Sequence, residues 1–285
     1  MIILVGEGRL GNQLFQYAYL ANRYPGKIIW CMGCEGLKQH VLTGPVRYFP
    51  RTARWWRLLS KALVCLARLH VIRLLAETGQ ECGRYVINLQ WGLVPWVVVV
   101  AGSYFQHASI LPSAAPVSPS MRCLEAAQRW LAEKRVEQGI ARGREFVFVH
   151  VRRGDYLRWP SREAPAVLPL EWYRRAMDWI RTEVKDPVFV VLGDDLPYIF
   201  EFFTESQDLI ISDADEGVDM AIMSKCSHGI LSASTFAWWG AFLSRESGGY
   251  KLPHEKRYIA PLFWAGHRSG AWFPGDFYTS WLTYM

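Results

Sequence analysis

Residues 146–156 have the sequence FVFVHVRRGDY, and this stretch does most to decide the fold class. The apolar run from Phe146 to His150 has the length and composition of a buried strand, and polar residues follow at its carboxyl end. Alternation places His150 and Arg152 on one side and Arg153 on the other. Ligands of open α/β sheets bind at this end of the strands, so the stretch predicts both a sheet and a site.

Each polar residue of this stretch also has a purely structural explanation. Asp155 could pair with a neighbouring arginine to fix the loop, and His150 could be a satisfied core residue. Because all of these residues occur at one strand end, a functional site is favoured over separate structural roles. In such a site one arginine would neutralise a diphosphate, while the imidazole would form a hydrogen bond with a neighbouring group.

Helix-like and strand-like segments alternate on both sides of this stretch. Expected helices cover 12–24, 124–138, 170–184, 219–224 and 236–244, and expected strands cover 2–5, 28–30, 97–101, 188–192 and 229–231. Prolines at 112, 116 and 119 predict a linker. The pattern predicts an α/β protein of two doubly wound, Rossmann-like halves facing a cleft, residues 1–115 and 116–285.

Composition fits a globular protein with a sizeable core, since 51% of the 285 residues are hydrophobic and 20% are charged. No apolar run reaches the roughly 18–20 residues of a membrane span, and the first residues lack the features of a secretory signal. We therefore expect a cytoplasmic protein. The six cysteines are scattered along the chain, so we expect them to be reduced. Cys31 and Cys34 have the spacing of half a zinc site, but no second pair of cysteines or histidines at ligand spacing completes it.

The basic residues indicate an anionic partner. Only 8 of the 32 basic residues are lysine, and the net charge is +6. Arginine suits bidentate contacts to phosphate, and the charge fits a nucleotide, a nucleic acid or lipid headgroups. No zinc-finger, homeodomain or RNA-recognition signature accompanies it, so nucleic acid has the least support.

Gly6, Gly8 and Gly11 match the dinucleotide fingerprint G-x-G-x-x-G between a strand and a helix. The acid that should hold the ribose about 20 residues later is missing, because the nearest one is Glu35. Three interpretations stay open here: a nicotinamide cofactor, a loop for another phosphate or sugar, and a turn that needs glycine for packing.

The segment 212–240 combines acids with a hydroxyl-rich helix entry. Ser232, Ser234 and Thr235 could hold a phosphate at a helix N-terminus, or one of them could be an ordinary N-cap. Asp213 and Asp215 form a D-x-D pair that could bind a metal, although an acidic loop that caps the next helix is the commoner explanation.

These segments together resemble the α-1,2-fucosyltransferase family, glycosyltransferase family 11. The resemblance runs in order through 8–18, 102–106, 150–156, 170–173, 193–195 and 213–240. It implies a GT-B-like fold and transfer of L-fucose from GDP-fucose to a galactose 2-hydroxyl in a glycan acceptor, with inversion and no required metal or other cofactor. Residues 1–115 would form the acceptor-side domain, and residues 116–285 would bind GDP-fucose.

The resemblance also implies roles for individual residues. Arg152 would hold the β-phosphate, and Asn12 would sit near the reacting sugar. His150 and Asp219 would contact the guanosine part, and Ser234 with Thr235 the diphosphate. The full implied donor-binding set is His150, Arg152, Asp194, Asp219, Ser232, Ser234, Thr235 and Phe236. Departure of GDP leaves charge on the β-phosphate, which a fixed guanidinium stabilises most in the transition state.

The base that takes the acceptor proton has two candidates. Asp155 is the only acid within the best motif, which makes it the first choice. Alternatively, GDP itself takes the proton in a dissociative mechanism, and Asp155 is a structural partner of Arg153.

Residues 53–77 form an unbroken helical candidate in which Arg54, Arg57, Lys61 and Arg68 fall on one stripe. Such a helix could lie on an anionic membrane, which would suit a lipid-linked acceptor, or pack on its own domain with the stripe solvated. Trp91 and Trp96 flank a strand and are expected to be structural. Besides the transferase, two classes stay open: a nicotinamide oxidoreductase and a noncatalytic glycan- or nucleotide-binding protein.

Overall fold

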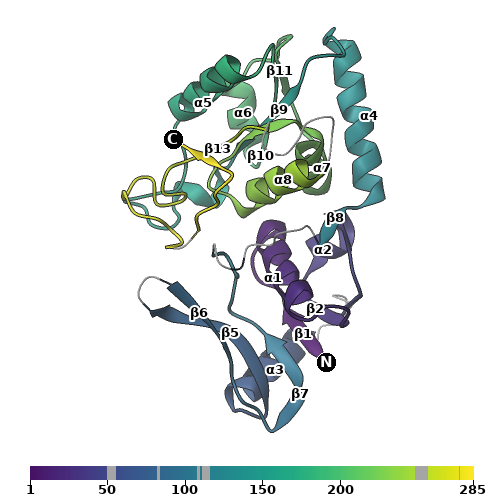
Figure 1. The fold of residues 1–285 in the computed structure, drawn as a ribbon, viewed down its shortest axis with the longest axis vertical. Coiled ribbons are helices and arrows are strands. Elements are labelled where there is room, and N and C mark those ends of the chain that lie inside the picture. Colours follow the sequence, from purple (N-terminus) through teal and green to yellow (C-terminus); the bar gives the residue numbers. More distant parts are fainter. Residues whose placement is uncertain (50–55, 82–83, 108–109, 111–115, 248–255, 276) are drawn as a thin grey trace. The chain divides into compact units, whose positions relative to one another are not determined.

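In the computed structural model the chain forms two compact units, unit 1 (Met1–Ser118) and unit 2 (Pro119–Met285). Each unit is built on its own six-stranded sheet (Figure 1). The structure describes all residues except 50–55, 82–83, 108–109, 111–115, 248–255 and 276. The acceptor and donor roles expected for residues 1–115 and 116–285 stay predictions.

The sheet of unit 1 has the strand order β4-β2-β1-β7-β5-β6 and is parallel except for β6. In chain order its elements are β1 (Ile2–Val5), α1 (Leu10–Arg23), β2 (Ile29–Met32), α2 (Glu35–His40), β3 (Val41–Thr43), β4 (Val46–Tyr48), α3 (Trp56–Arg68), β5 (Ile72–Glu81), β6 (Arg84–Leu89) and β7 (Val94–Val100). β8 (Val117–Pro119) joins β3 in a two-stranded sheet. The central strand β1 pairs through Ile2 with Ile29 of β2 and Val98 of β7.

The sheet of unit 2 has the order β11-β10-β9-β12-β13-β14 and is parallel throughout. Its elements are α4 (Met121–Glu137), β9 (Phe146–Val151), the 3₁₀ turn Gly154–Leu157, α5 (Leu170–Glu183), β10 (Val188–Gly193), α6 (Leu196–Phe202), β11 (Leu209–Ile211), α7 (Glu216–Lys225), β12 (His228–Ile230), α8 (Thr235–Glu246), β13 (Tyr258–Ala260) and β14 (Thr283–Tyr284). All six residues of β9 are buried, as expected for a central strand covered on both faces.

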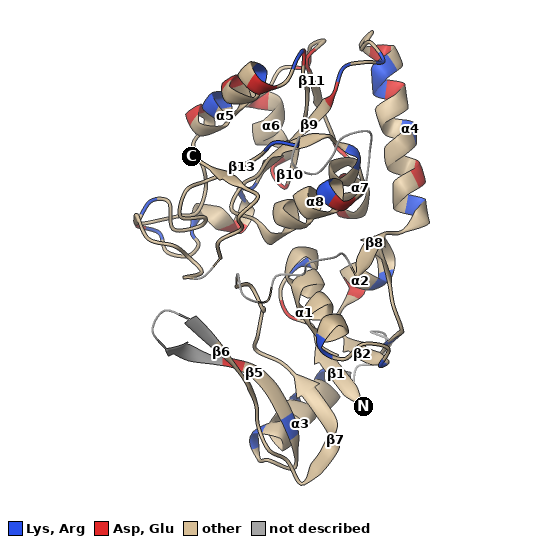
Figure 2. Ribbon diagram, viewed as in Figure 1, with Lys and Arg blue, Asp and Glu red and all other residues tan. Residues whose placement is uncertain are grey.

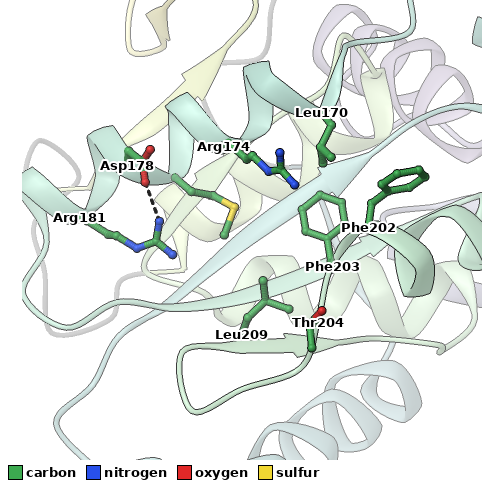
Figure 3. Close-up of a pocket in the computed structure, with 9 residues that line it drawn as sticks. Leu170, Arg174, Asp178, Arg181, Phe202, Phe203, Thr204 and Leu209 are labelled. Carbon is green, nitrogen blue, oxygen red and sulfur yellow. Dashed lines mark hydrogen bonds and ion pairs between the residues drawn. The ribbon is translucent and has the colours of Figure 1, made fainter.

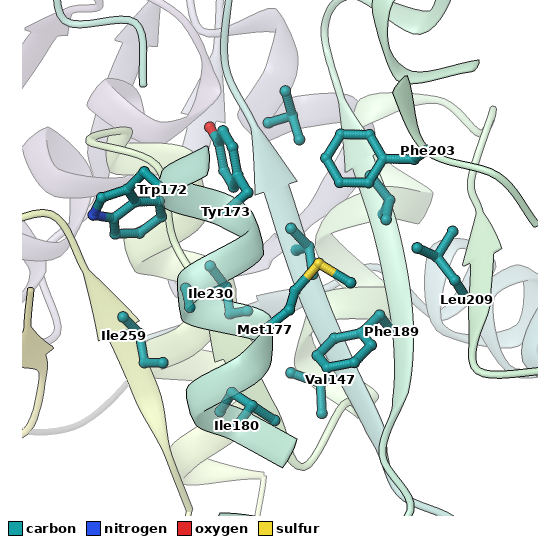
Figure 4. Close-up of a cluster of buried hydrophobic side chains, with 14 of the residues drawn as sticks. Val147, Trp172, Tyr173, Met177, Ile180, Phe189, Phe203, Leu209, Ile230 and Ile259 are labelled. Atoms are coloured by element: carbon teal, nitrogen blue, oxygen red, sulfur yellow. The ribbon is translucent and has the colours of Figure 1, made fainter. Parts of the chain in front are cut away.

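The core of unit 2 lies between β9, β10 and the helix α5. Met177 and Ile180 of α5 pack with Val147 and Phe189 of the sheet, and all four are buried (Figure 4). Side chains at positions i and i+3 of a helix share one face, which explains why α5 offers these two residues to the sheet. This packing fixes β9 and therefore the loop that follows it.

The helices α4, α6, α7 and α8 of unit 2 each start with a side-chain cap. Ser120 accepts a hydrogen bond from the Cys123 amide at 3.4 Å, and Asp195 accepts one from the Tyr198 amide at 3.3 Å. Asp215 accepts hydrogen bonds from the amides of Gly217 and Val218, both at 2.9 Å. Such caps satisfy amides that have no partner inside the helix, so they locate the helix starts.

The prediction of one helix over 53–77 was wrong. α3 ends at Arg68, His70 adopts φ 58°, and β5 begins at Ile72. The mainly apolar segment from Val71 to Leu75 forms its backbone hydrogen bonds as a strand beside β7. This tertiary pairing outweighs the local helical pattern. Arg54 lies outside the described residues. No helix within the described ranges is both long enough and apolar enough to span a membrane.

Candidate functional site

The carboxyl end of β9 carries the side chains that the sequence singled out. His150 and Arg152 are buried, with 3% and 9% of their surface exposed. β10 and β12 are the neighbours of β9, and Asp194 and Ser232 follow them. Parallel strands end at one edge of the sheet, so residues that are far apart in sequence meet there.

Arg152 is held between two carboxylates. Its Nη1 lies 2.8 Å from Oδ2 of Asp194, and its Nη2 pairs with Oδ1 of Asp155. Its Cζ lies 5.1 Å from the centre of the Tyr156 ring. The Nε of Arg152 is buried and has no hydrogen-bond partner among the described residues. Because a buried N–H without a partner is costly, this donor is available for an anionic ligand.

Asp194 and Asp155 differ in how they hold Arg152. The Asp194 side chain is 14% exposed and also accepts a hydrogen bond from the Arg153 amide at 2.8 Å. The Asp155 side chain is 62% exposed. Asp194 therefore links the Arg152 guanidinium to the backbone of the loop, whereas Asp155 contacts the guanidinium from the solvent-exposed side.

Arg153 points away from this pair, as strand alternation predicts. Its Nε lies 3.0 Å from Oδ2 of Asp195, and its guanidinium stacks 3.6 Å from the centre of the Tyr198 ring. The alternative in which Asp155 is the structural partner of Arg153 was therefore wrong, because Asp155 pairs with Arg152. Sequence analysis offered only Asp155 as a partner of Arg153, although the acids Asp194 and Asp195 after the neighbouring strand β10 were the available signal.

His150 contacts the start of α8. Its Nδ1 lies 2.8 Å from Oγ of Ser232, and its ring lies 5.6 Å from that of Phe236. Ser234 is the N-cap of α8 and accepts a hydrogen bond from the Phe236 amide at 3.3 Å. Thr235 is the first residue of the helix. The structure thus brings His150, Ser232, Ser234, Thr235 and Phe236 to one helix N-terminus, where the helix dipole favours an anion.

Asp219 lies inside unit 2, on α7. The hydroxyl of Ser212 donates a hydrogen bond of 2.7 Å to Oδ1 of Asp219. Burial raises the pKa of Asp219 to about 8, and the nearby Asp215 and Asp213 raise it further while the Ser212 hydrogen bond lowers it. The carboxyl group therefore holds its proton at neutral pH and can donate as well as accept a hydrogen bond.

The D-x-D pair caps a helix. Asp215 is the N-cap of α7, which confirms the capping interpretation, and Asp213 is exposed. No cluster of three or more histidine, cysteine, aspartate or glutamate side chains suited to a metal occurs in the described residues. At Cys31, a hydrogen bond with Cys34 and burial raise the pKa of the thiol.

Asn12 belongs to unit 1, apart in sequence from the other predicted residues. It lies on α1, and its Oδ1 accepts a hydrogen bond of 2.9 Å from Nε2 of Gln106. Gly8 adopts φ 72°, and a Cβ there would collide with the Asn12 side chain; a Cβ on Gly6 would collide with Sγ of Cys34. Both glycines therefore have a packing role, which supports the third interpretation of the glycine loop.

A separate pocket of unit 2 contains none of the predicted site residues. It has a volume of about 310 Å³ and lies between α5 and the segment that follows α6 (Figure 3). Arg174, Met177 and Phe202 line it, and Arg181 at its edge pairs with Asp178 at 2.8 Å.

Three solved structures that align with this chain are glycosyltransferases. The family 9 glycosyltransferase of Veillonella parvula aligns with a TM-score of 0.56 at 11% identity and covers 100% of this chain and 85% of its own. ADP-heptose heptosyltransferase II of E. coli has a TM-score of 0.53 at 11% identity, with coverage of 100% and 89%. POFUT1 in complex with GDP-fucose aligns with a TM-score of 0.52 at 11% identity. This alignment covers 90% of this chain and 97% of the POFUT1 chain. The fold is GT-B, and the predicted fold class is confirmed.

Sequence relatives are galactoside alpha-(1,2)-fucosyltransferases. Over 126 residues, 42% of this chain, the identity is 36% to galactoside alpha-(1,2)-fucosyltransferase 1 of Rattus norvegicus and 37% to that of Homo sapiens. The chain spans about a third of those relatives, since each match covers 34% of their length. Residues 117–257 match the model of glycosyl transferase family 11. This range includes the arginine site at the end of β9, and over these residues the chain is similar to glycosyl transferase family 11.

Proposed function

We propose that this chain is an inverting glycosyltransferase that moves L-fucose from GDP-fucose to the 2-hydroxyl of a galactose in a glycan acceptor. The observation that carries the proposal is the buried Arg152, which two carboxylates hold and whose Nε has no partner in the described part of the chain. The names of the sequence relatives and the GDP-fucose bound to POFUT1 support this substrate class.

Arg152 would act on the leaving group. In the reaction, the bond between the fucose C1 and the β-phosphate oxygen breaks, and its electron pair stays on GDP. The guanidinium is fixed before the reaction and stabilises this charge more as it develops, which lowers the barrier. Arginine would therefore do the work that a metal does in other transferases, and we propose that no metal is required.

The N-terminus of α8 would hold the rest of the donor. Ser234 and Thr235 would contact the diphosphate, His150 and Asp219 the guanosine part, and Asn12 would approach the reacting sugar. Asp194 would act through Arg152. Support comes from the hydrogen bond between His150 and Ser232 and from the position of Ser234 as the N-cap.

Asp155 is the proposed base. The acceptor oxygen bonds to C1 from the face opposite GDP, and its proton would pass to the Asp155 carboxylate. The exposed Asp155 side chain is accessible to a substrate, while its pairing with Arg152 also gives it a positioning role. In the alternative, the proton passes to the β-phosphate of GDP, and Asp155 only positions Arg152.

The variants Asp155→Asn and Asp194→Asn separate these two roles. A base contributes about 100-fold to 10,000-fold, so Asp155→Asn should lose at least about 100-fold in kcat and change the shape of the pH profile. Asp194→Asn removes a partner of Arg152 without removing the base, so its pH profile should keep its shape. Near wild-type kcat and unchanged pH dependence in Asp155→Asn would assign the proton to GDP.

The proposed function is tested by calorimetric titration with GDP, GDP-fucose, GDP-mannose and NADPH in EDTA, followed by GDP release with lactose as acceptor. Binding of GDP-fucose and acceptor-stimulated GDP release in EDTA are expected. Binding of NADPH alone would support the oxidoreductase instead. Binding of GDP-fucose without any turnover on a panel of galactosides would support a noncatalytic binding protein.

Cytoplasmic location and contact of 53–77 with an anionic membrane belong to the same proposal. Arg57, Lys61 and Arg68 are exposed on α3, which supports a contact with lipid headgroups. Such a contact would suit a glycan acceptor that is carried on a lipid.

A further inference from the structure

The two units carry very different charges. Residues 1–118 contain twelve Lys or Arg and four Asp or Glu, a formal charge of +8, whereas residues 119–285 contain twenty and twenty-two, a charge of −2. Between Glu35 and Glu77 there are eight basic residues and no acid. The net positive charge of the chain therefore belongs to unit 1, although the arginine site lies in unit 2.

Helix α3 is attached to unit 1 by one face only. Leu59, Leu63, Val64 and Ala67 pack with the core cluster that contains Ile72 of the sheet. A second apolar stripe of the helix, which includes Leu58 and Leu66, faces away from this core and is exposed. The exposed stripe is therefore not needed to hold the helix on the sheet.

Further exposed apolar side chains lie at the end of α3. His70 follows the helix, and its backbone oxygen accepts a hydrogen bond from the Leu93 amide at 2.9 Å, while its Nδ1 lies 3.1 Å from the Trp91 oxygen. Leu69 continues the helix by donating to the Cys65 oxygen at 2.9 Å. These hydrogen bonds hold Trp91 and Leu93 against His70, which directly follows Leu69.

We call this surface the apolar rim: Leu58, Leu66, Leu69, Trp91 and Leu93. Four of its side chains are 63% to 69% exposed, and Leu66 is 39% exposed. Trp96 is 69% exposed as well, so the expectation that Trp91 and Trp96 are structural was wrong. Trp96 is not part of the rim, because strand alternation points it away from Val97 and Val99, which pack in the cluster with α3. Solvent-exposed leucine and tryptophan in such numbers mark an interaction surface.

Basic side chains border the rim. On a helical wheel of 100° per residue, Arg57, Lys61 and Arg68 form a stripe beside that of Leu58, Leu66 and Leu69. Figure 2 shows α3 with basic bands and no acidic residue. A helix with leucine on one side of its exposed surface and lysine or arginine on the other is typical of segments that lie in the interface of anionic membranes.

We propose that unit 1 binds an anionic lipid bilayer by placing the apolar rim among the headgroups, with Arg57, Lys61 and Arg68 against the lipid phosphates. Charge complementarity selects this partner over a second copy of the chain, because a symmetric contact through the rim would bring the two basic stripes together. The inference extends the proposed membrane contact to Trp91 and Leu93, which lie outside 53–77, and it does not depend on which sugar the enzyme transfers.

Vesicle flotation of the full-length chain tests the proposal. We expect flotation with vesicles of phosphatidylcholine and phosphatidylglycerol, and little with phosphatidylcholine alone. Binding should fall in about 1 M salt, where the screening length is about 3 Å. Absence of flotation with the anionic vesicles at low salt would overturn the proposal.

Two variants with matched controls locate the surface. Each basic residue near an anionic surface changes partitioning about fivefold, so Arg57→Gln with Lys61→Gln and Arg68→Gln should weaken binding by about 100-fold. The control replaces Arg129, Arg142 and Arg175, exposed arginines of unit 2, by glutamine. Trp91→Ser with Leu93→Ser should weaken binding at least about tenfold, whereas Val136→Ser, an exposed apolar position of α4, should not.

The outcomes are distinguishable from failure of the proposed function. Flotation uses no donor or acceptor, and the rim variants should retain GDP release with lactose. Equal loss of binding in the control variants would refute this surface. Sedimentation that shows a dimer which Trp91→Ser with Leu93→Ser dissociates, together with no flotation, would assign the rim to a second copy.

Discussion

The proposed mechanism depends most on the guanidinium of Arg152. Its two Nη atoms are occupied by Asp194 and Asp155, while the buried Nε has no partner in the described residues. A lysine ammonium in its place could not satisfy two carboxylates and a phosphate with the same fixed geometry. The charge at this position matters less than its planar arrangement of donors.

We therefore expect Arg152→Lys to lower kcat by about 100-fold to 1,000-fold, the cost of losing one fixed donor in a transition state. Arg153→Lys is the matched control, because Arg153 is held by Asp195 and Tyr198. Steady-state kinetics with GDP-fucose and lactose measure both. Equal kcat values for Arg152→Lys and the wild type would remove Arg152 from the mechanism.

Asp219 makes the stability of unit 2 depend on pH. Its pKa is about 8 in the folded chain and about 3.8 in the unfolded chain, so between these values the folded state binds one proton more. Stability should therefore fall as pH rises toward 8, by up to about 1.4 kcal/mol per pH unit. Asp219→Asn cannot ionise and should melt at a temperature that changes less between about pH 5 and pH 8. Parallel melting curves of variant and wild type across this range would contradict the prediction.

At the scale of elements, the start of α8 has a structural and a functional task. Ser234 caps the helix, so Ser234→Ala should cost about 1 kcal/mol in stability. It should also weaken GDP binding, because the same hydroxyl is proposed to contact the diphosphate. Ser120→Ala, which removes the cap of α4, should lose similar stability and leave GDP affinity unchanged. Titration calorimetry and thermal melting measure the two effects, and equal GDP affinity in both variants would limit Ser234 to capping.

Elements with a strong local pattern were predictable, and those set by long-range pairing were not. The strand expected at 188–192 is β10 (Val188–Gly193), and the helix expected at 170–184 is α5 (Leu170–Glu183), because apolar runs and helical spacing are local signals. The strand β5 was missed, because the local sequence from Val71 to Leu75 is compatible with a helix. Only the long-range pairing with β7 makes this segment a strand. α7 begins at Glu216 rather than 219, because Asp215 caps it.

The site was predictable as a set of residues but not as a set of contacts. The sequence placed His150, Arg152 and Asp155 at the end of a strand and Ser232 to Thr235 at a helix entry, and the structure has both features. It did not show that Asp194 and Asp155 share Arg152, because β9 and β10 are more than 35 residues apart along the chain and are adjacent only in the sheet.

At the scale of the whole molecule, the two units divide the work between two surfaces. Unit 2 carries the arginine site, and unit 1 carries the charge and the apolar rim. Each unit has a separate buried cluster, built around Ile3 and Val99 in unit 1 and around Val147 and Phe189 in unit 2. A ligand of unit 2 should therefore stabilise mainly the core of unit 2.

Hydrogen exchange in the presence of GDP tests this division. A ligand at 100 times its Kd stabilises the folded state by about 2.7 kcal/mol, which should slow exchange of the most protected amides of unit 2 by about 100-fold. The amides of β1 and β7 should keep their rates, because the proposed GDP contacts belong to unit 2. Arg152→Gln is the control and should lose most of the protection at the same GDP concentration. Equal slowing in both units would show that they unfold as one cooperative structure, and GDP binding would then stabilise the sheet of unit 1 as well.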